Sequence, residues 1–206
     1  MEGVHPVLSD GTLHADLPVR ERMPNLISTQ WLQTVVRLPM AWRGSLEVHT
    51  TSGNVNLNGV SGTDLDVESI SGQLKATRIH GMSVSLQTVS GPILAEKLTA
   101  ETAKLHSISG PINTVELDAR NVHLSTVSGA AECMFTDVFT RFDGNSVSGS
   151  VRILTPMTEV NAVLKTVSGR LLTENISIRE TGPQLRFTTV NGNLEIVGNI
   201  PVHGSP

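Results

Sequence analysis

Histidine, acidic and lysine side chains recur in this 206-residue chain at spacings that could gather them on one surface. His49 precedes Glu68 by 19 residues, and His106 precedes His123 by 17. If about 19 residues make one turn of a repeating fold, imidazole and carboxylate groups fall within reach of a divalent metal ion. We favour the alternative, a solvated face of mixed charge, and expect no metal ion and no cofactor. The residues of this face are Glu47, His49, Asp66, Glu68, Lys104, His106 and His123.

Three carboxylates, at Asp64, Asp66 and Glu68, alternate along one short segment and would point the same way from a strand. Glycoside hydrolases use paired carboxylates, and polysaccharide lyases need a proton acceptor in a groove. The chain has no tyrosine, however, and its two tryptophans, Trp31 and Trp42, precede the regular repeats, so platforms for sugar rings are missing. We therefore expect no enzyme. A carbohydrate-active β-helix of lyase or hydrolase type is the alternative.

Composition excludes several classes of partner. The net charge is -4 and no run of Lys or Arg occurs, so nucleic acid is not expected to bind. No apolar stretch approaches the roughly 18 residues that a membrane span needs, and the first residues lack the basic start and apolar core of a signal peptide. The single cysteine, Cys133, excludes a disulfide within the chain and is expected to be buried.

The elements that would position these side chains come from an internal repeat. Ser-Gly or Asn-Gly recurs with spacings of 19, 19, 19, 19, 20, 20 and 23 residues. Every copy has Ser or Thr three residues before the glycine, and seven of the eight have Val or Ile two before it. A serine repeated in this way is structural rather than catalytic. The glycines, which we interpret as corners between strands, are Gly53, Gly72, Gly91, Gly110, Gly129, Gly149, Gly169 and Gly192.

Apolar residues alternate on both sides of each glycine, which is the period of a half-buried strand. Val84 and Leu86 precede one corner, and Ile93 and Ala95 follow it. A third inward position recurs every 19 residues, at Val60, Ile79, Leu98 and Leu117. The sequence therefore predicts an all-β, single-stranded, right-handed parallel β-solenoid (β-helix) of about eight coils of roughly 19–20 residues. We expect positive φ at the glycines, and a ladder of Ser and Thr hydroxyls bonded to the backbone at the corners.

The ends of the repeat divide the chain. We expect an N-terminal segment and cap at 1–40, a solenoid domain at 41–198 and a loose C-terminal tail at 199–206. Gln33 to Leu38 is predicted to be a strand that Pro39 ends, and Trp31 and Trp42 to cap the first coil. Three phenylalanines, Phe135, Phe139 and Phe142, break the pattern, and we interpret them as core of an irregular coil rather than an exposed contact patch.

A strand ending in Leu38-Pro39, the pattern L-x-V-x-T-x-S-G from Leu46 to Gly53, and T-V-S-G corners at 88–91, 126–129 and 166–169 resemble the adhesin-like β-solenoid family of bacterial domains of unknown function. The resemblance covers roughly residues 33–198. It implies a right-handed, non-enzymatic all-β domain, often tied to the bacterial cell envelope, in which the signature residues form corners and core.

These observations lead to one expected function and two alternatives. The expectation is a structural or interaction module, adhesin-like, whose partner is a protein or a cell-envelope component. Its location is extracytoplasmic or at the cell envelope by resemblance alone, and the chain is a monomer or associates weakly. The alternatives are the carbohydrate-active β-helix and a solenoid filament assembled end to end through uncapped coils.

Overall fold

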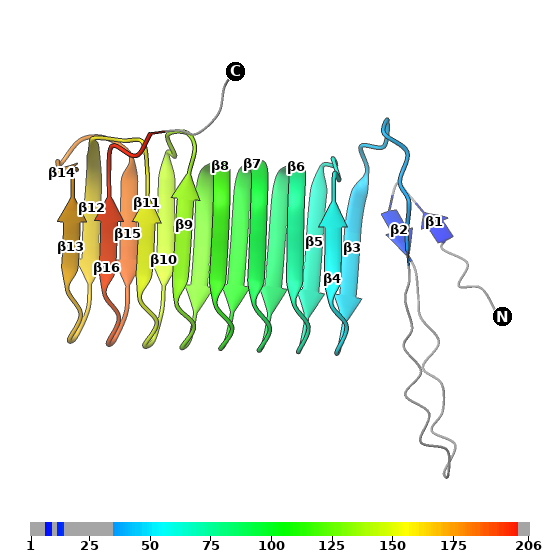
Figure 1. Ribbon diagram of the computed structural model, residues 1–206, viewed down its shortest axis with the longest axis horizontal. Coiled ribbons are helices and arrows are strands. Elements are labelled where there is room, and N and C mark those ends of the chain that lie inside the picture. Colours follow the sequence, from blue (N-terminus) through cyan, green and yellow to red (C-terminus); the bar gives the residue numbers. More distant parts are fainter. Residues whose placement is uncertain (1–6, 10–11, 15–34, 202–206) are drawn as a thin grey trace, which may run out of the picture.

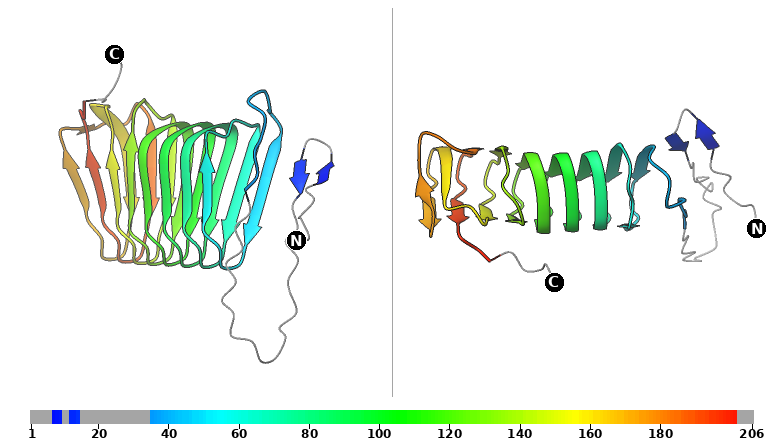
Figure 2. Two further views of the ribbon diagram at one scale, coloured as in Figure 1. Left: turned by 45° about the vertical axis from the view of Figure 1, so that its right-hand side comes forward. Right: turned by 90° about the horizontal axis from the view of Figure 1, so that it is seen from above.

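The computed structural model describes residues 7–9, 12–14 and 35–201, which form sixteen strands and no helix. The strands stack as successive coils into a rod with two long layers, which two further views show from other sides (Figures 1 and 2). Apart from the β1–β2 hairpin, every pair of neighbouring strands is parallel. The predicted all-β solenoid of about eight coils is confirmed.

Each coil contributes extended chain to both layers, either as two separate strands or as one long strand. The first layer holds the strands that lead into the corner glycines: β3 (Ser45–Thr50), β5 (Asp64–Ser69), β10 (Arg141–Asn145), β12 (Glu159–Lys165) and β15 (Gln184–Thr188). The second layer holds the strands that follow: β4 (Val55–Asn58), β9 (Ala131–Phe135), β11 (Val151–Leu154), β13 (Leu171–Glu174) and β16 (Leu194–Val197). Three long strands run through both layers, β6 (Leu74–Thr88), β7 (Ile93–Ser107) and β8 (Ile112–Thr126). The short strands are β1 (Val7–Ser9), β2 (Thr12–His14) and β14 (Ser177–Ile178).

The core consists of columns of equivalent apolar residues from successive coils. Leu86, Leu105 and Leu124 are register partners, and each is 1% exposed. Because side chains alternate across a strand, the residues between them face solvent. The core therefore extends along the whole stack instead of gathering at one centre.

The predicted third side of the coil is present. Ile79, Leu98 and Leu117 are buried and Val60 is half-buried. The residue before each of them bends the chain in the left-handed region: φ is +67° at Gly59, +54° at Arg78, +57° at Lys97 and +58° at Glu116. Three of these four positions carry a side chain with a Cβ, which costs conformational energy there.

The corner glycines are needed for close approach and not for positive φ, so that expectation was wrong. Among the described glycines only Gly59 and Gly182 have positive φ. A Cβ on Gly91 would lie 1.9 Å from the carbonyl oxygen of Gly72, and a Cβ on Gly110 would lie 1.9 Å from that of Gly91. The coils touch through these backbones, and no side chain fits between them.

The predicted hydroxyl ladder at the corners is present in seven of the eight copies. The hydroxyl oxygen three residues before the glycine accepts a hydrogen bond from the glycine N–H, at 2.7 to 3.2 Å. Ser107, before Gly110, is the exception, because its buried Oγ has no hydrogen-bond partner among the described residues. The repeated Ser and Thr thus satisfy backbone donors that the turn leaves unpaired.

The coils are not stacked in chain order at the C-terminal end. In the first layer the strand order is β8, β10, β15, β12, and in the second it is β9, β11, β16, β13. The coil of β15 and β16, which comes last in the sequence, lies between the two coils that precede it, and we call it the inserted coil. The coil of β12 and β13, which contains Gly169, is therefore the last in the stack.

The N-terminal predictions have mixed outcomes. Val35 to Leu38 are not a strand, because they pair with no strand in the described part of the chain, and Val35 remains 60% exposed. The chain turns after them, where the Trp42 N–H donates to the Pro39 carbonyl. Trp42 packs against the core as expected, while Trp31, Gln33 and Thr34 lie outside the described residues.

The irregular coil after Gly129 is filled by aromatic side chains, as predicted. Phe135, Phe139 and Phe142 are 3%, 0% and 0% exposed, and their ring centroids are 4.8 to 6.3 Å apart. Cys133, two residues before Phe135 in the sequence, is also buried, and this burial raises the pKa of its thiol to about 12. This thiol is a core side chain rather than a nucleophile.

Candidate functional site

The outer face of the first layer carries the histidines and carboxylates that the sequence singled out. His49 on β3 lies directly beside Glu68 on β5, as predicted from their spacing. Its Nδ1 is 3.1 Å from Glu68 Oε2, and its Nε2 is 2.5 Å from Glu47 Oε1. The imidazole is held between two carboxylates on a surface where all three side chains are about half exposed.

This arrangement favours a protonated imidazole. The hydrogen bond to Glu47 is the largest influence that raises the pKa of His49, and the hydrogen bond to Glu68 adds to it. A protonated imidazole donates from both nitrogens and has no lone pair for a metal ion. When the imidazole is protonated, this group is a surface ion pair.

The other candidate ligands lie further along the rod. Lys104 on β7 is the register partner of His123 on β8, and His106 is the partner of Ser125, so the two histidines are diagonal to each other as expected. His123 Nδ1 lies 3.9 Å from Asp143 Oδ2. Throughout the described part of the chain, no three His, Cys, Asp or Glu side chains come together in a way that could hold a metal ion.

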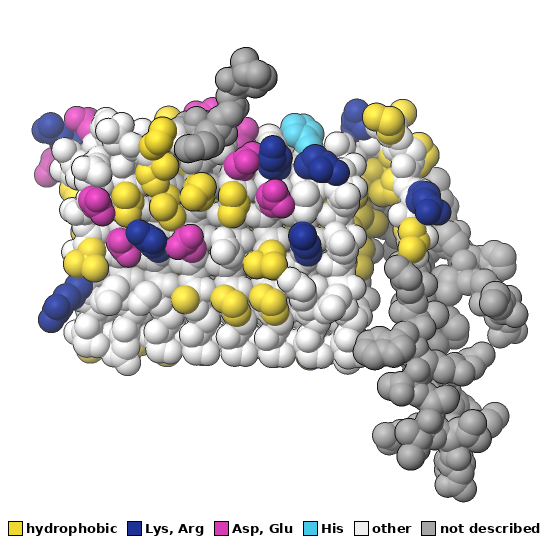
Figure 3. All heavy atoms as spheres, viewed as in Figure 1, with side chains coloured by type: hydrophobic (Ala, Val, Ile, Leu, Met, Phe, Trp, Pro, Cys, Tyr) yellow, Lys and Arg dark blue, Asp and Glu magenta, His cyan; other side chains and the backbone are white. Residues whose placement is uncertain are grey.

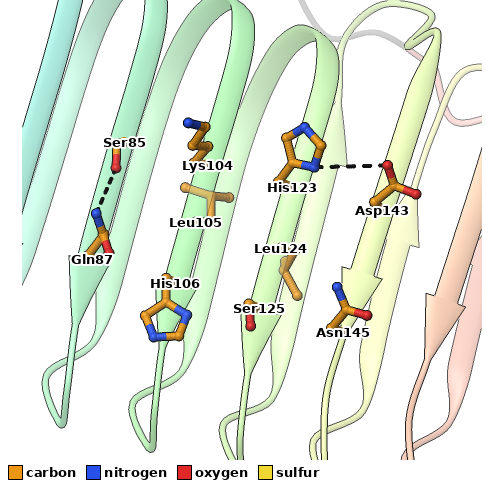
Figure 4. A pocket seen from close by; sticks show the side chains of 10 residues that line it. All are labelled: Ser85, Gln87, Lys104, Leu105, His106, His123, Leu124, Ser125, Asp143 and Asn145. Carbon is orange, nitrogen blue, oxygen red and sulfur yellow. Dashed lines mark hydrogen bonds and ion pairs between the residues drawn. The ribbon is translucent and has the colours of Figure 1, made fainter.

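A shallow hollow of about 270 Å³ lies over these strands, between β6 and β10 (Figure 4). Polar side chains from four neighbouring coils border it, and Gln87 Nε2 donates to Ser85 Oγ at 3.1 Å. Asp143, at its far side, is held by Arg141, whose Nε lies 2.5 Å from Asp143 Oδ2 and whose pKa this carboxylate raises. The hollow is open, and its lining combines apolar, neutral polar and charged side chains. Its lining residues are Ser85, Gln87, Lys104, Leu105, His106, His123, Leu124, Ser125, Asp143 and Asn145.

The acidic cluster considered for carbohydrate chemistry lies outside this hollow. Asp64, Asp66 and Glu68 alternate along β5 and share its outer face. Asp64 accepts a 3.4 Å hydrogen bond from Ser45 Oγ, and Asp66 Oδ1 is buried without a hydrogen-bond partner among the described residues. A second hollow of about 450 Å³, where the inserted coil meets β10, is bordered by Asn121, Val138, Phe139, Thr140, Arg141, Gly182, Pro183 and Gln184. None of these described lining residues is a carboxylate.

A surface that the sequence analysis did not single out runs along the corners. The Val or Ile two residues before each glycine points to solvent in seven coils, with exposed fractions from 38% to 82%. None of the eight corner tetrapeptides contains a charged residue. In Figure 3 the lower edge of the rod, where the corners lie, shows no charged side chains between its two ends. We call this row the apolar edge; it consists of Ile70, Val89, Ile108, Val127, Val147, Val190 and Val167.

The polar groups beside the apolar edge are already satisfied within the chain. In five corners the serine before the glycine donates its hydroxyl to a main-chain carbonyl of the preceding coil, at 3.0 to 3.5 Å. These bonds fix the shape of the edge and leave its methyl groups as the main feature that a partner would meet. The alternation of side chains along a strand could have revealed this edge. Since the Thr or Ser faces inward, the Val or Ile that follows it must face outward.

One comparison with known proteins gives a match, and it is to a protein family. The family model described as Toastrack DUF4097 matches residues 5–196. No curated protein matches the chain, and no solved structure does. In the described part of the chain there is no helix of the length and apolarity that crossing a membrane requires.

Proposed function

This chain belongs to the Toastrack family, and we propose that it works as a non-enzymatic interaction module, a stiff rod that presents its apolar edge to a partner. The observation that carries the proposal is the apolar edge itself. Seven exposed β-branched side chains lie in one row, without a charge in any corner. Contiguous apolar surface of this kind is typical of sites of contact with other macromolecules.

The stack keeps the row straight and evenly spaced. Neighbouring coils are joined by continuous parallel ladders from β5 to β10, and the corner backbones touch at each glycine. Successive edge residues are therefore about 4.8 Å apart, the strand spacing of a sheet. A partner meets a preformed surface, which lowers the entropic cost of binding.

The partner that fits best is an uncharged or apolar surface of a protein or cell-envelope component. The resemblance to adhesin-like envelope domains supports this choice, and the open hollow over β6 to β10, which Lys104 and Asp143 border, offers no comparable apolar row. The separation of Asp64, Asp66 and Glu68 from both hollows supports a non-enzymatic role.

The test is co-sedimentation of the purified chain with bacterial cell-envelope fractions. Val89→Lys combined with Val147→Lys places two charges on the apolar edge, and we expect binding to fall several-fold while circular dichroism stays unchanged. Val115→Lys combined with Val138→Lys is the matched control, because these valines are 40% and 55% exposed outside the edge. Equal binding by the two variants would overturn the proposal, and so would depolymerisation of a polysaccharide that depends on Asp64, Asp66 or Glu68.

A further inference from the structure

The two ends of the rod differ in what covers them. At the N-terminal end, β2 pairs with β3 at Ser45 and Leu46, so the β1–β2 hairpin extends the first layer, while β4 in the second layer has β6 as its only described partner. At the other end, β12 and β13 pair on their inner side with β15 and β16. On the outer side, among the described residues, only Glu159 and Val160 have a strand partner, the two-residue β14. Most of this terminal edge is unpaired (Figure 1).

Core positions are also open at this end. Leu164 occupies the column in which Leu105 is 1% and Phe187 is 0% exposed, yet Leu164 is only partly buried. Leu171 is likewise partly buried, whereas its neighbour Leu194 is fully buried. The last coil thus ends the core without covering it, which leaves apolar surface beside an unpaired strand edge.

The backbone of β13 has a defined pattern at this edge. Leu194 N–H donates to the Arg170 carbonyl and Gly198 N–H donates to the Glu174 carbonyl, so these alternate residues bond towards β16. In a parallel pair the intervening residues turn their N–H and C=O groups the other way. Leu171 and Thr173 therefore direct theirs to the free edge, where no described strand pairs with β13.

We propose that a second copy of this chain covers this end, with the two β13 strands antiparallel across a two-fold axis at Leu172. This register sets Leu171 opposite Thr173 of the second copy, and both carry edge-facing backbone groups, as an antiparallel hydrogen-bonded pair requires. Leu172, 49% exposed, then meets its own counterpart. The proposal does not depend on the apolar edge.

Charge complementarity selects this register. Arg170 and Glu174 are each two residues from Leu172, so the two-fold axis places Arg170 opposite Glu174 of the second copy, twice. Both side chains are exposed, and neither forms an ion pair within the part of the chain that the structure describes. Opposite charges on directly facing strand positions favour the pairing.

The two-fold contact makes this assembly a closed dimer. A filament would need β12 and β13 of one copy to continue in parallel onto β3 and β4 of the next, and the β1–β2 hairpin already pairs with the start of β3. A two-fold contact uses the same surface on both copies and leaves no further free end of that type. This outcome differs from the filament considered from the sequence.

The experiment is sedimentation equilibrium of the chain over a range of concentrations. The wild type should form a dimer with twice the mass of one chain. Arg170→Glu or Glu174→Arg alone should raise the dissociation constant about tenfold or more, because like charges then face each other. The double variant, with both substitutions, should restore it, since the pairs are re-formed with signs exchanged. The matched control is the pair Glu101→Arg and Arg120→Glu, an exposed ion pair of the middle coils that should leave the dimer intact.

A second variant tests the backbone contact. Thr173→Pro removes one edge-facing N–H and no bond to β16, so the monomer should fold, as checked by circular dichroism, while the dimer is lost. A wild type that stays monomeric, filaments in place of dimers, or a dimer unaffected by both single charge reversals would each overturn the proposal.

Discussion

The coils from β5 to β8 and the coils from β10 to β16 are built from the same repeat, but they stack by different rules. In the first region each coil pairs with the next one in the chain, with 19 residues between equivalent positions. In the second region the last coil is inserted between its two predecessors, and corner spacings lengthen to 20 and 23 residues. The repeat thus fixes how one coil contacts another, while the connections fix which coils become neighbours.

In both regions, substitution at the contact between corners should lower the unfolding free energy the most. Gly110→Ala places a Cβ 1.9 Å from the Gly91 carbonyl oxygen, so the stack must separate there, and we expect a loss of at least about 3 kcal/mol of unfolding free energy. Gly59→Ala is the control, because it has φ +67° and nothing within 4 Å of the added Cβ, and it should cost about 1 kcal/mol. Urea denaturation measures both. Similar losses would show that the backbone contact is not the cause.

The inserted coil should depend on its core as an interior coil does, and the terminal coil should not. Phe187→Ala, in the inserted coil, removes a fully buried ring and should cost about 3–5 kcal/mol. Leu164→Ala, in the same column of the terminal coil, should cost about 1 kcal/mol, because Leu164 is only partly buried. If denaturation curves gave the reverse order, the terminal coil would have to lie inside the stack.

The hydroxyl ladder predicts different effects of substitution at two corners of the regular region. Thr88→Val deprives the buried Gly91 N–H of its 3.1 Å acceptor and should cost about 1–3 kcal/mol. Ser107→Ala should be close to neutral, since Ser107 Oγ is buried without a partner among the described residues. Thermal melts of the two variants check this difference. An equal loss would mean that Ser107 bonds in solution as Thr88 does.

The bend before the third side should tolerate a stabilising change. Lys97→Gly relieves a φ of +57° and should raise the unfolding free energy by about 0.5–1 kcal/mol, reduced by the loss of the exposed Lys97–Glu116 pair. Glu96→Gly, one residue earlier and without positive φ, should destabilise instead. A lower melting temperature for Lys97→Gly would contradict the strain argument.

The smallest expected effect concerns pH at the N-terminal coils. His49 has a raised pKa when folded, so its contribution is fully present below the unfolded value of 6.5 and is lost as the pH rises through the folded pKa. The exposed pair makes this contribution small. An NMR titration should give a pKa above 6.5 for His49 that falls in the Glu47→Gln variant. A value unchanged by that substitution would remove Glu47 as the cause.

The sequence was sufficient for the coil and insufficient for the order of coils. Equivalent glycines, core leucines and hydroxyls recur at fixed spacing, so the columns of Leu86, Leu105 and Leu124 follow from the period. The segments that reverse the order, 155–158 and 175–183, carry no such pattern and resemble ordinary loops. The bend at Arg78, Lys97 and Glu116 also escaped prediction, because long charged side chains do not signal positive φ.

Some of the candidate surfaces could likewise be predicted from the sequence and others could not. His49 and Glu68 were placed together correctly because their separation equals one coil, and the diagonal of His106 and His123 follows from the same register. The apolar edge was missed although its residues were visible, since a Val or Ile beside a glycine was not assigned to solvent. The free edge of β13 depends on the inserted coil, which no local pattern marks.

The inserted coil also constrains how the protein is made. A ribosome releases the β12–β13 coil before the β15–β16 coil, yet the first of these pairs with the second in both layers. The earlier coils can stack one by one as they emerge, whereas β12 and β13 lack their neighbouring coil, β15 and β16, until residues up to Val197 have been synthesised. Completion of this rod is therefore a late event at one end, and a chain that has emerged only to about residue 180 would hold six stacked coils and one without its native neighbouring coil.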